Sequence, residues 1–182
     1  DTVHQDKSVK YAGTAVTLTD TANEENDLRV TNATFKGRGN SSWVYYQKKG
    51  YQIKFDKKTS VLGMAKAKKW VLLANASDDS MMRNKLAFDL AEQLGMTYVP
   101  DGEYVDLWIN GDYRGTYLVC EKAEIGTTRL NLNDPKGVLM EQDEAFYASE
   151  DIWIENHSTG KHFVVKESVT EDDPALLREA VK

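Results

Sequence analysis

The chain has 182 residues, of which 41% are hydrophobic and 29% are charged, and its formal net charge is -6 at pH 7. These values are ordinary for a globular protein, and we expect a single domain over residues 1–182 with one buried core. The acidic balance argues against a general nucleic-acid binder, and the lack of a long apolar run argues against membrane insertion.

The side chains that most often carry chemistry are sparse. The only cysteine, Cys120, lies in an apolar run, where a buried and unreactive thiol is expected. The histidines His4, His157 and His162 have neither metal-ligand spacing nor the pattern of a catalytic triad. The sequence therefore predicts no metal site and no nucleophilic catalysis.

The first part of the chain predicts two strands joined by an acidic loop. Residues 15–19 and 28–35 alternate as strands, and residues 20–27 (DTANEEND) form the loop. A calcium site is the alternative for this loop. The loop lacks the spaced acids and the central glycine of a calcium loop, so a solvated turn is favoured.

A glycine-flanked turn, residues 37–42, comes next and is followed by the strand 51–55. Strict alternation in this strand places Tyr51, Ile53 and Phe55 toward the core and Lys54 on the other side. Backbone amides beside glycine can approach an anion, and Arg38 and Lys54 would add positive charge, so the arrangement could hold phosphate. The plainer alternative is a hairpin turn with solvated cations.

A strand buried on both faces is predicted at residues 70–74, because the run is continuously apolar. Residues 75–80 (NASDDS) then signal a helix start, and residues 81–94 form the most strongly marked helix. Its apolar side chains recur every four residues and should pack on the sheet: Met82, Leu86, Leu90 and Leu94. Arg83 lies in the first turn, where a cation is mildly unfavourable.

A hairpin follows, with strands at residues 104–109 and 113–121 and an Asn-Gly turn between them. Three shorter strands are predicted at residues 137–141, 152–154 and 163–166, and a helix begins near residue 172 with proline in its first turn. This helix is short for so clear a start, which suggests that the chain stops inside a larger domain. The fold class is therefore α+β, a mainly antiparallel sheet with one principal helix.

Several motifs in this order closely resemble the spore-coat protein H (CotH) kinase family and cover most of residues 35–124. They are GRGNSSW, KKGYQIKFD, LGMAKAKKWVLLAN, SMMRNKLAFDLAEQLG and YVDLWINGDYRGTYLVCEK. The resemblance implies the small lobe of a protein-kinase-like fold. Family members include spore-coat kinases, modules of secreted bacterial cellulosome-type assemblies and fungal surface proteins, so it also implies a secreted or cell-surface protein, with a bacterial source favoured.

The resemblance further implies an ATP site built from small-lobe residues: Arg38, Lys54, Arg83, Asn84, Asp89 and Glu121. Arg38 and Lys54 fall where phosphate-binding residues are expected. Arg83, Asn84 and Glu121 match motif positions. An ion pair could orient Lys54, with Glu121 as the first choice of partner and Asp89 as its competitor.

The family's acidic catalytic and Mg²⁺-binding motifs lie beyond the last predicted helix, so the resemblance implies little or no activity for this chain alone. Two functions stay open. The first is the nucleotide-binding lobe of a kinase that phosphorylates Ser or Thr on a protein partner with ATP and Mg²⁺. The second is a noncatalytic surface or scaffold module that binds a protein or glycan.

Overall fold

The computed structural model describes residues 2–150 and 152–169, and its chain divides into two compact units, Asp1–Lys122 and Ala123–Lys182. The single domain expected from the length stays a prediction. The helix predicted from residue 172 lies outside the described residues.

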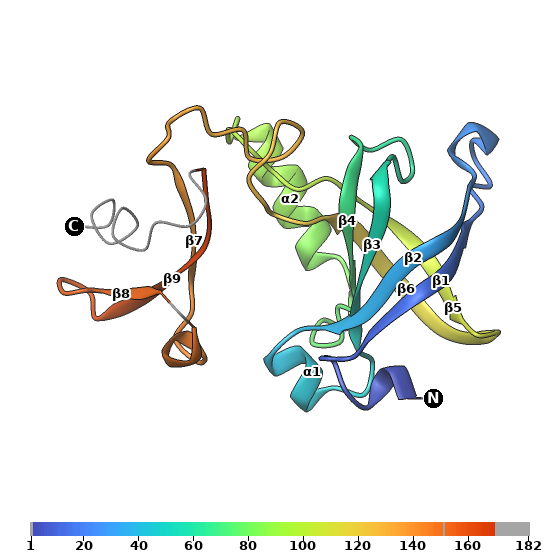
Figure 1. Cartoon of the computed structure of the whole chain (residues 1–182), viewed down its shortest axis with the longest axis horizontal. Coiled ribbons are helices and arrows are strands. Elements are labelled where there is room, and N and C mark those ends of the chain that lie inside the picture. Colours follow the sequence, from blue (N-terminus) through green and yellow to red (C-terminus); the bar gives the residue numbers. More distant parts are fainter. Residues whose placement is uncertain (1, 151, 170–182) are drawn as a thin grey trace. The chain divides into compact units, whose positions relative to one another are not determined.

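The first unit is built around a six-stranded sheet with the order β1-β2-β3-β4-β6-β5 (Figure 1). Every neighbouring pair of strands is antiparallel. The strands are β1 (Lys10–Leu18), β2 (Leu28–Arg38), β3 (Gly50–Thr59), β4 (Ala67–Leu73), β5 (Gly102–Ile109) and β6 (Asp112–Glu121). The helices of this unit are α1 (Ser41–Tyr45) and α2 (Arg83–Gln93), with 3₁₀ helices at Thr2–His4 and Glu24–Asn26. The predicted α+β class is confirmed.

One face of this sheet, here called the inner face, carries the main hydrophobic core. Tyr51 and Phe55 of β3 are buried there and Ile53 is half-buried, while Lys54 is exposed, so the predicted alternation is confirmed. Trp70 and Leu72 of β4 also face this core.

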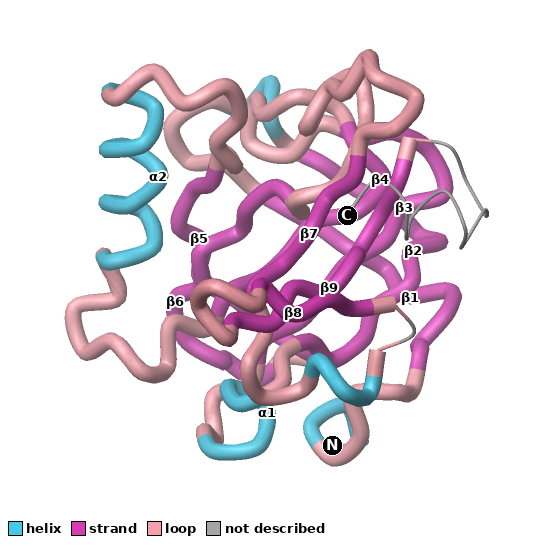
Figure 2. Tube along the Cα trace, turned by 90° about the vertical axis from the view of Figure 1, so that its left-hand side faces the viewer, coloured by secondary structure: helices cyan, strands magenta, loops and turns pink. Residues whose placement is uncertain are grey.

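The central strand β4 is buried on both faces, as its apolar run predicts. Val71, which lies between Trp70 and Leu72 in β4, points to the opposite, outer face. There it packs with Leu118 and Cys120 of β6. These residues form a second, smaller apolar cluster, and Phe88 of α2 packs against it. The helix α2 therefore contacts the β4–β6 part of the outer face through Phe88. In Figure 2 the helix lies beside β5 and β6.

The helix α2 forms where predicted, but the face assigned to the sheet is wrong. Its leucine stripe is exposed to solvent, with Leu86 63%, Leu90 52% and Leu94 73% accessible. The half-buried side chains lie on the other side of the helix: Lys85, Phe88, Asp89 and Ala91. Lys85 and Asp89 can occupy this less exposed side because they neutralise each other across one turn, 2.7 Å apart.

Exposure of the stripe changes the expected effect of truncating it. Leu86→Ala or Leu90→Ala should alter the free energy of unfolding by less than about 0.5 kcal/mol, because neither side chain leaves water on folding. The matched control is Leu118→Ala, since Leu118 is 0% exposed, and it should cost about 2 to 5 kcal/mol. Urea titration followed by circular dichroism measures both. Equal losses for Leu86 and Leu118 would show that the stripe is covered.

The glycine-flanked turn contains a helical turn, α1, that its sequence does not reveal. Trp43 of α1 packs on Gly37, and a Cβ at Gly37 would lie 2.4 Å from the Trp43 ring. Gly39 has a φ of 119°, which L side chains rarely adopt. Both glycines are therefore required by the chain's own packing, and Gly37 belongs to β2 rather than to an open loop.

The second unit contains a three-stranded antiparallel sheet with the order β7-β9-β8. Its strands are β7 (Val138–Gln142), β8 (Trp153–Asn156) and β9 (Lys161–Ser168), and a 3₁₀ helix spans Tyr147–Ser149. Strands form at all three predicted places, and β8 pairs with β9. His162 stacks on Tyr147, with ring centroids 3.7 Å apart, and fixes the start of β9 against the 3₁₀ helix.

Candidate phosphate-binding face

Lys54 projects from the outer face of the sheet, beyond the part that α2 covers. It lies opposite Thr34 of β2 and Lys69 of β4 in the strand register. The side chain is exposed and makes no hydrogen bond or ion pair with any described residue. Lys54 is therefore available to an anion from solvent.

Further cations lie on the same face along β1 and β2. Because side chains alternate along a strand, Thr34, Lys36 and Arg38 share one side of β2. Lys36 is opposite Lys10 on β1, and Arg38 ends β2 opposite Gly50 of β3. We call the resulting set the basic face, and its members are Lys10, Lys36, Arg38 and Lys54.

One acid, Asp56, lies on the same side of β3 as Lys54, but it forms no ion pair with a member of the basic face. Among the described residues, no side chain forms an ion pair with any member of the set. The acid of β3 on this side, Asp56, accepts a hydrogen bond from Asn32 at 2.6 Å instead. Burial lowers the pKa of Lys36, and the charges of Lys10, Arg38, Lys122 and Lys7 lower it further. A bound anion would relieve this repulsion.

The two acids expected to orient Lys54 lie elsewhere. Glu121 is opposite Trp70 in the register, so it belongs to the inner face, whereas Lys54 is on the outer face. Asp89 accepts a hydrogen bond from Lys85 and lines a hollow of about 340 Å³ between α2 and the segment that follows it. The structure thus brings Lys54 and Arg38 onto one face but joins neither acid to Lys54.

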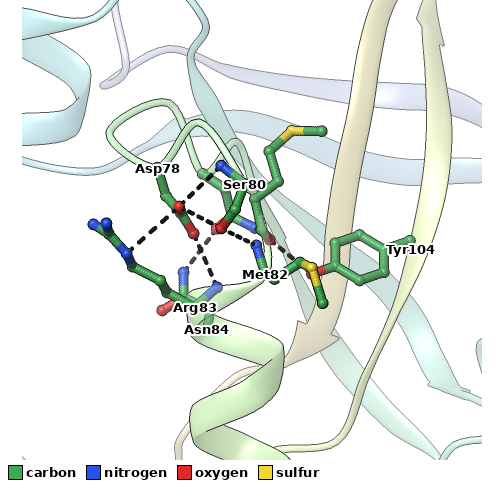
Figure 3. A network of polar contacts seen from close by, with 8 residues as sticks. Asp78, Ser80, Met82, Arg83, Asn84 and Tyr104 are labelled. Carbon is green, nitrogen blue, oxygen red and sulfur yellow. Dashed lines mark hydrogen bonds and ion pairs between the residues drawn. The ribbon is translucent and has the colours of Figure 1, made fainter.

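Arg83 and Asn84 belong to a polar network at the start of α2 (Figure 3). Its centre is Asp78, a buried carboxylate in the loop before the helix. Asp78 Oδ2 accepts a hydrogen bond from the backbone N–H of Arg83 at 2.9 Å, and Oδ1 accepts from the Ser80 hydroxyl at 2.7 Å. The Arg83 Nε atom lies 3.6 Å from Oδ1, on a side chain that is 80% exposed. The N-cap residue of α2 is Met82, which makes no side-chain cap hydrogen bond, so Asp78, within the predicted NASDDS start signal, accepts the first helical N–H from the preceding loop in its place.

The same network fixes a strained loop beside the helix. Asn84 donates to the Asn75 side-chain oxygen at 2.7 Å, and the Asn75 amide donates to the Met81 carbonyl at 2.9 Å. The Tyr104 hydroxyl donates to the same carbonyl at 2.7 Å. Asn75 and Met81 have φ values of 49° and 56°, an uncommon region that needs such support. Asn84 thus has a structural role in this network, and its predicted contact with ATP stays a prediction.

The network predicts a pH-dependent helix start. Hydrogen bonds from Arg83 and Ser80 lower the pKa of Asp78 below its usual value near 3.8. Because the folded pKa is the lower one, the stabilisation is present above the unfolded pKa and is lost as acid protonates Asp78. Asp78→Ala should speed hydrogen exchange at the Arg83 and Ser80 amides at neutral pH. The control is the exposed neighbour Asp79→Ala, and equal acceleration by both variants would contradict the capping role.

The described residues offer little support for a reactive thiol, a metal site or a membrane-spanning helix. Cys120 is buried, as predicted, and burial raises its pKa to about 12, which disfavours the reactive thiolate. The described residues contain no grouping of His, Cys, Asp and Glu that could hold a metal ion. None of their helices combines the length and the apolar surface needed to cross a bilayer.

The described residues form an α+β protein whose main sheet carries, on one face, a set of cations that make no ion pair with described residues. Residues 35–180 match the family model described as CotH kinase protein, and the chain belongs to this family. It is 30% identical over 138 residues to the inner spore coat protein H of Bacillus subtilis (strain 168). This match covers 75% of the chain but 37% of the relative, so the chain spans little more than a third of that protein.

Proposed function

We propose that this chain is the nucleotide-binding lobe of an atypical CotH-type protein kinase. In a complete domain, with Mg²⁺, it would transfer phosphate from ATP to Ser or Thr of a protein partner. The observation that carries the proposal is the basic face, where Lys54 and Arg38 lie without acidic partners on one side of the sheet. Family membership supports the class of reaction.

The position of α2 also supports the proposal. Phe88 anchors the helix on the outer face through Val71 and Cys120, the same face from which Lys54 projects. A strand lysine on the face of an antiparallel sheet that also carries a helix is one feature of kinase small lobes. We infer that the cations of the basic face bind the phosphates of the nucleotide.

In this proposal the cations of the basic face contribute to catalysis by electrostatic stabilisation. Phosphoryl transfer spreads negative charge over the oxygens of the transferred group, and preorganised cations stabilise that charge more than they stabilise the substrate. Lys54 would act as such a cation, held by its strand rather than by an ion pair. Because no described group of acids fits Mg²⁺, we assign no step of the reaction to the metal.

A titration of the 182-residue chain with ATP tests the proposal directly. We expect saturable binding that weakens as salt is raised and that inorganic tripolyphosphate competes away, because phosphates provide the main contacts. If ATP at millimolar concentration gives no saturable signal while the protein is folded, the nucleotide-lobe proposal fails. Circular dichroism of the same sample establishes that it is folded.

The second candidate is a noncatalytic surface or scaffold module that binds a protein partner. The observation in its favour is the exposed apolar stripe of α2, formed by Met82, Leu86, Leu90 and Leu94. The spore coat location named for the Bacillus relative supports a surface-associated site for either function. Failure of ATP binding together with an intact fold would favour this second candidate.

A further inference from the structure

The centre of the basic face is a residue that the family resemblance does not single out. Lys36 has Lys10 directly across on β1, Arg38 two residues along β2, and Gln52 directly across on β3. Lys54 is two residues beyond Gln52 on the same side of β3, so it is diagonal to Lys36. Lys36 is thus the member of the set that neighbours every other cation.

The surroundings of Lys36 raise the free energy of its charged form. The side chain is half-buried, so it has lost part of its hydration, and no described acid pairs with it. Its pKa is lowered first by burial and then by the charges of Lys10, Arg38, Lys122 and Lys7. On a chain whose net charge is -6, such a local excess of positive charge favours an anion at this point of the sheet.

We propose that Lys36 is the central contact of a polyphosphate site and binds phosphate groups together with Arg38 and Lys54. The ligand class is a phosphoanhydride, whose several charged oxygens can reach cations on neighbouring strands at once. Lys10 extends the site toward the edge strand β1. The inference rests on the proposed function for the source of the phosphates, since ATP and free polyphosphate share this chemistry.

The test measures binding of inorganic tripolyphosphate and of ATP to the 182-residue chain at low salt. Lys36→Gln should weaken tripolyphosphate binding about tenfold or more, as expected for loss of one charge-assisted contact. Lys36→Arg keeps the charge and should retain most of the affinity. The matched control is Lys57→Gln, which removes the same charge from an exposed position of β3.

Each outcome decides the inference. Equal weakening by Lys36→Gln and Lys57→Gln would overturn it, because the general field of the protein would then explain the binding. It would also be overturned if the unchanged chain did not bind tripolyphosphate. Tight ATP binding that Lys36→Gln leaves unchanged would overturn it while the proposed function stands. Lys36-dependent binding of tripolyphosphate without ATP binding would support the inference while the nucleotide function fails.

Discussion

Lys54→Ala should abolish most phosphoryl transfer when this chain is assayed within a complete CotH domain. Removing one preorganised charge from a transition state costs about 100-fold or more in rate. The fold should be unaffected, because Lys54 is exposed and makes no contact with a described side chain that its loss would break. The measurement is transfer of the γ-phosphate from ATP to a protein substrate.

The control for this experiment is Lys57→Ala on the same strand, which should keep full activity and the same thermal unfolding midpoint. Arg38→Ala should reduce activity in the same direction, since Arg38 shares the basic face with Lys54. Undiminished transfer by Lys54→Ala would refute the assignment. Loss of activity accompanied by an equal loss of folded protein would point to a structural role instead.

Trp70→Ala should cause the largest loss of stability among the substitutions considered. Trp70 is 0% exposed on the central strand β4, and its indole N–H donates to the Ala67 carbonyl at 3.3 Å. Deleting this side chain should cost about 3 to 5 kcal/mol, against a total stability of about 5 to 15 kcal/mol for a typical domain. Urea titration followed by circular dichroism gives the difference.

The exposed Trp108 provides the comparison for Trp70. It is 58% accessible and packs against Tyr113 in a tilted arrangement with ring centroids 5.0 Å apart. Trp108→Ala should therefore cost only about 1 kcal/mol, the value of an aromatic pair at the surface. Similar losses for the two tryptophans would mean that the β5–β6 hairpin is more deeply buried than the structure shows.

Much of the sheet could be predicted because its strands carry local signals. Alternation around Lys54, the continuous apolar run at Trp70 and the Asn110-Gly111 turn each specify a strand or a hairpin from neighbouring residues alone. These signals also predict correctly that Lys54 opposes the core. The order of the strands in the sheet cannot be predicted from such local signals, because it depends on which strands that are distant in sequence pair.

The packing of the helices could not be predicted from local sequence signals. The leucine stripe of α2 correctly predicts a helix, but periodicity does not reveal which partner covers a face, and here Phe88 rather than Leu86 meets the sheet. The helical turn at Trp43 has only five residues, too few for a periodic pattern. The contact between Trp43 and Gly37 that shapes this turn is visible only in three dimensions.

The candidate site was predictable in part for the same reason. Lys54 and Arg38 follow from alternation and from family motifs, but Lys36 needs the register of three strands before its central position is evident. Alternation of Thr34, Lys36 and Arg38 along β2 was the available signal. The pairing of β6 with β4 places Glu121, the predicted partner of Lys54, on the inner face. No short stretch of sequence shows this pairing.

The sheet order also determines when this unit can form during synthesis. The strands β1 to β4 pair in the order in which they leave the ribosome, so a meander can assemble from the nascent chain. The other edge of β4 belongs to β6, which is made only after α2 and β5. Until then the open edge of β4 and the apolar Val71 on its outer face have no partner. The interval between these two strands is therefore the period in which the growing chain most needs protection from aggregation.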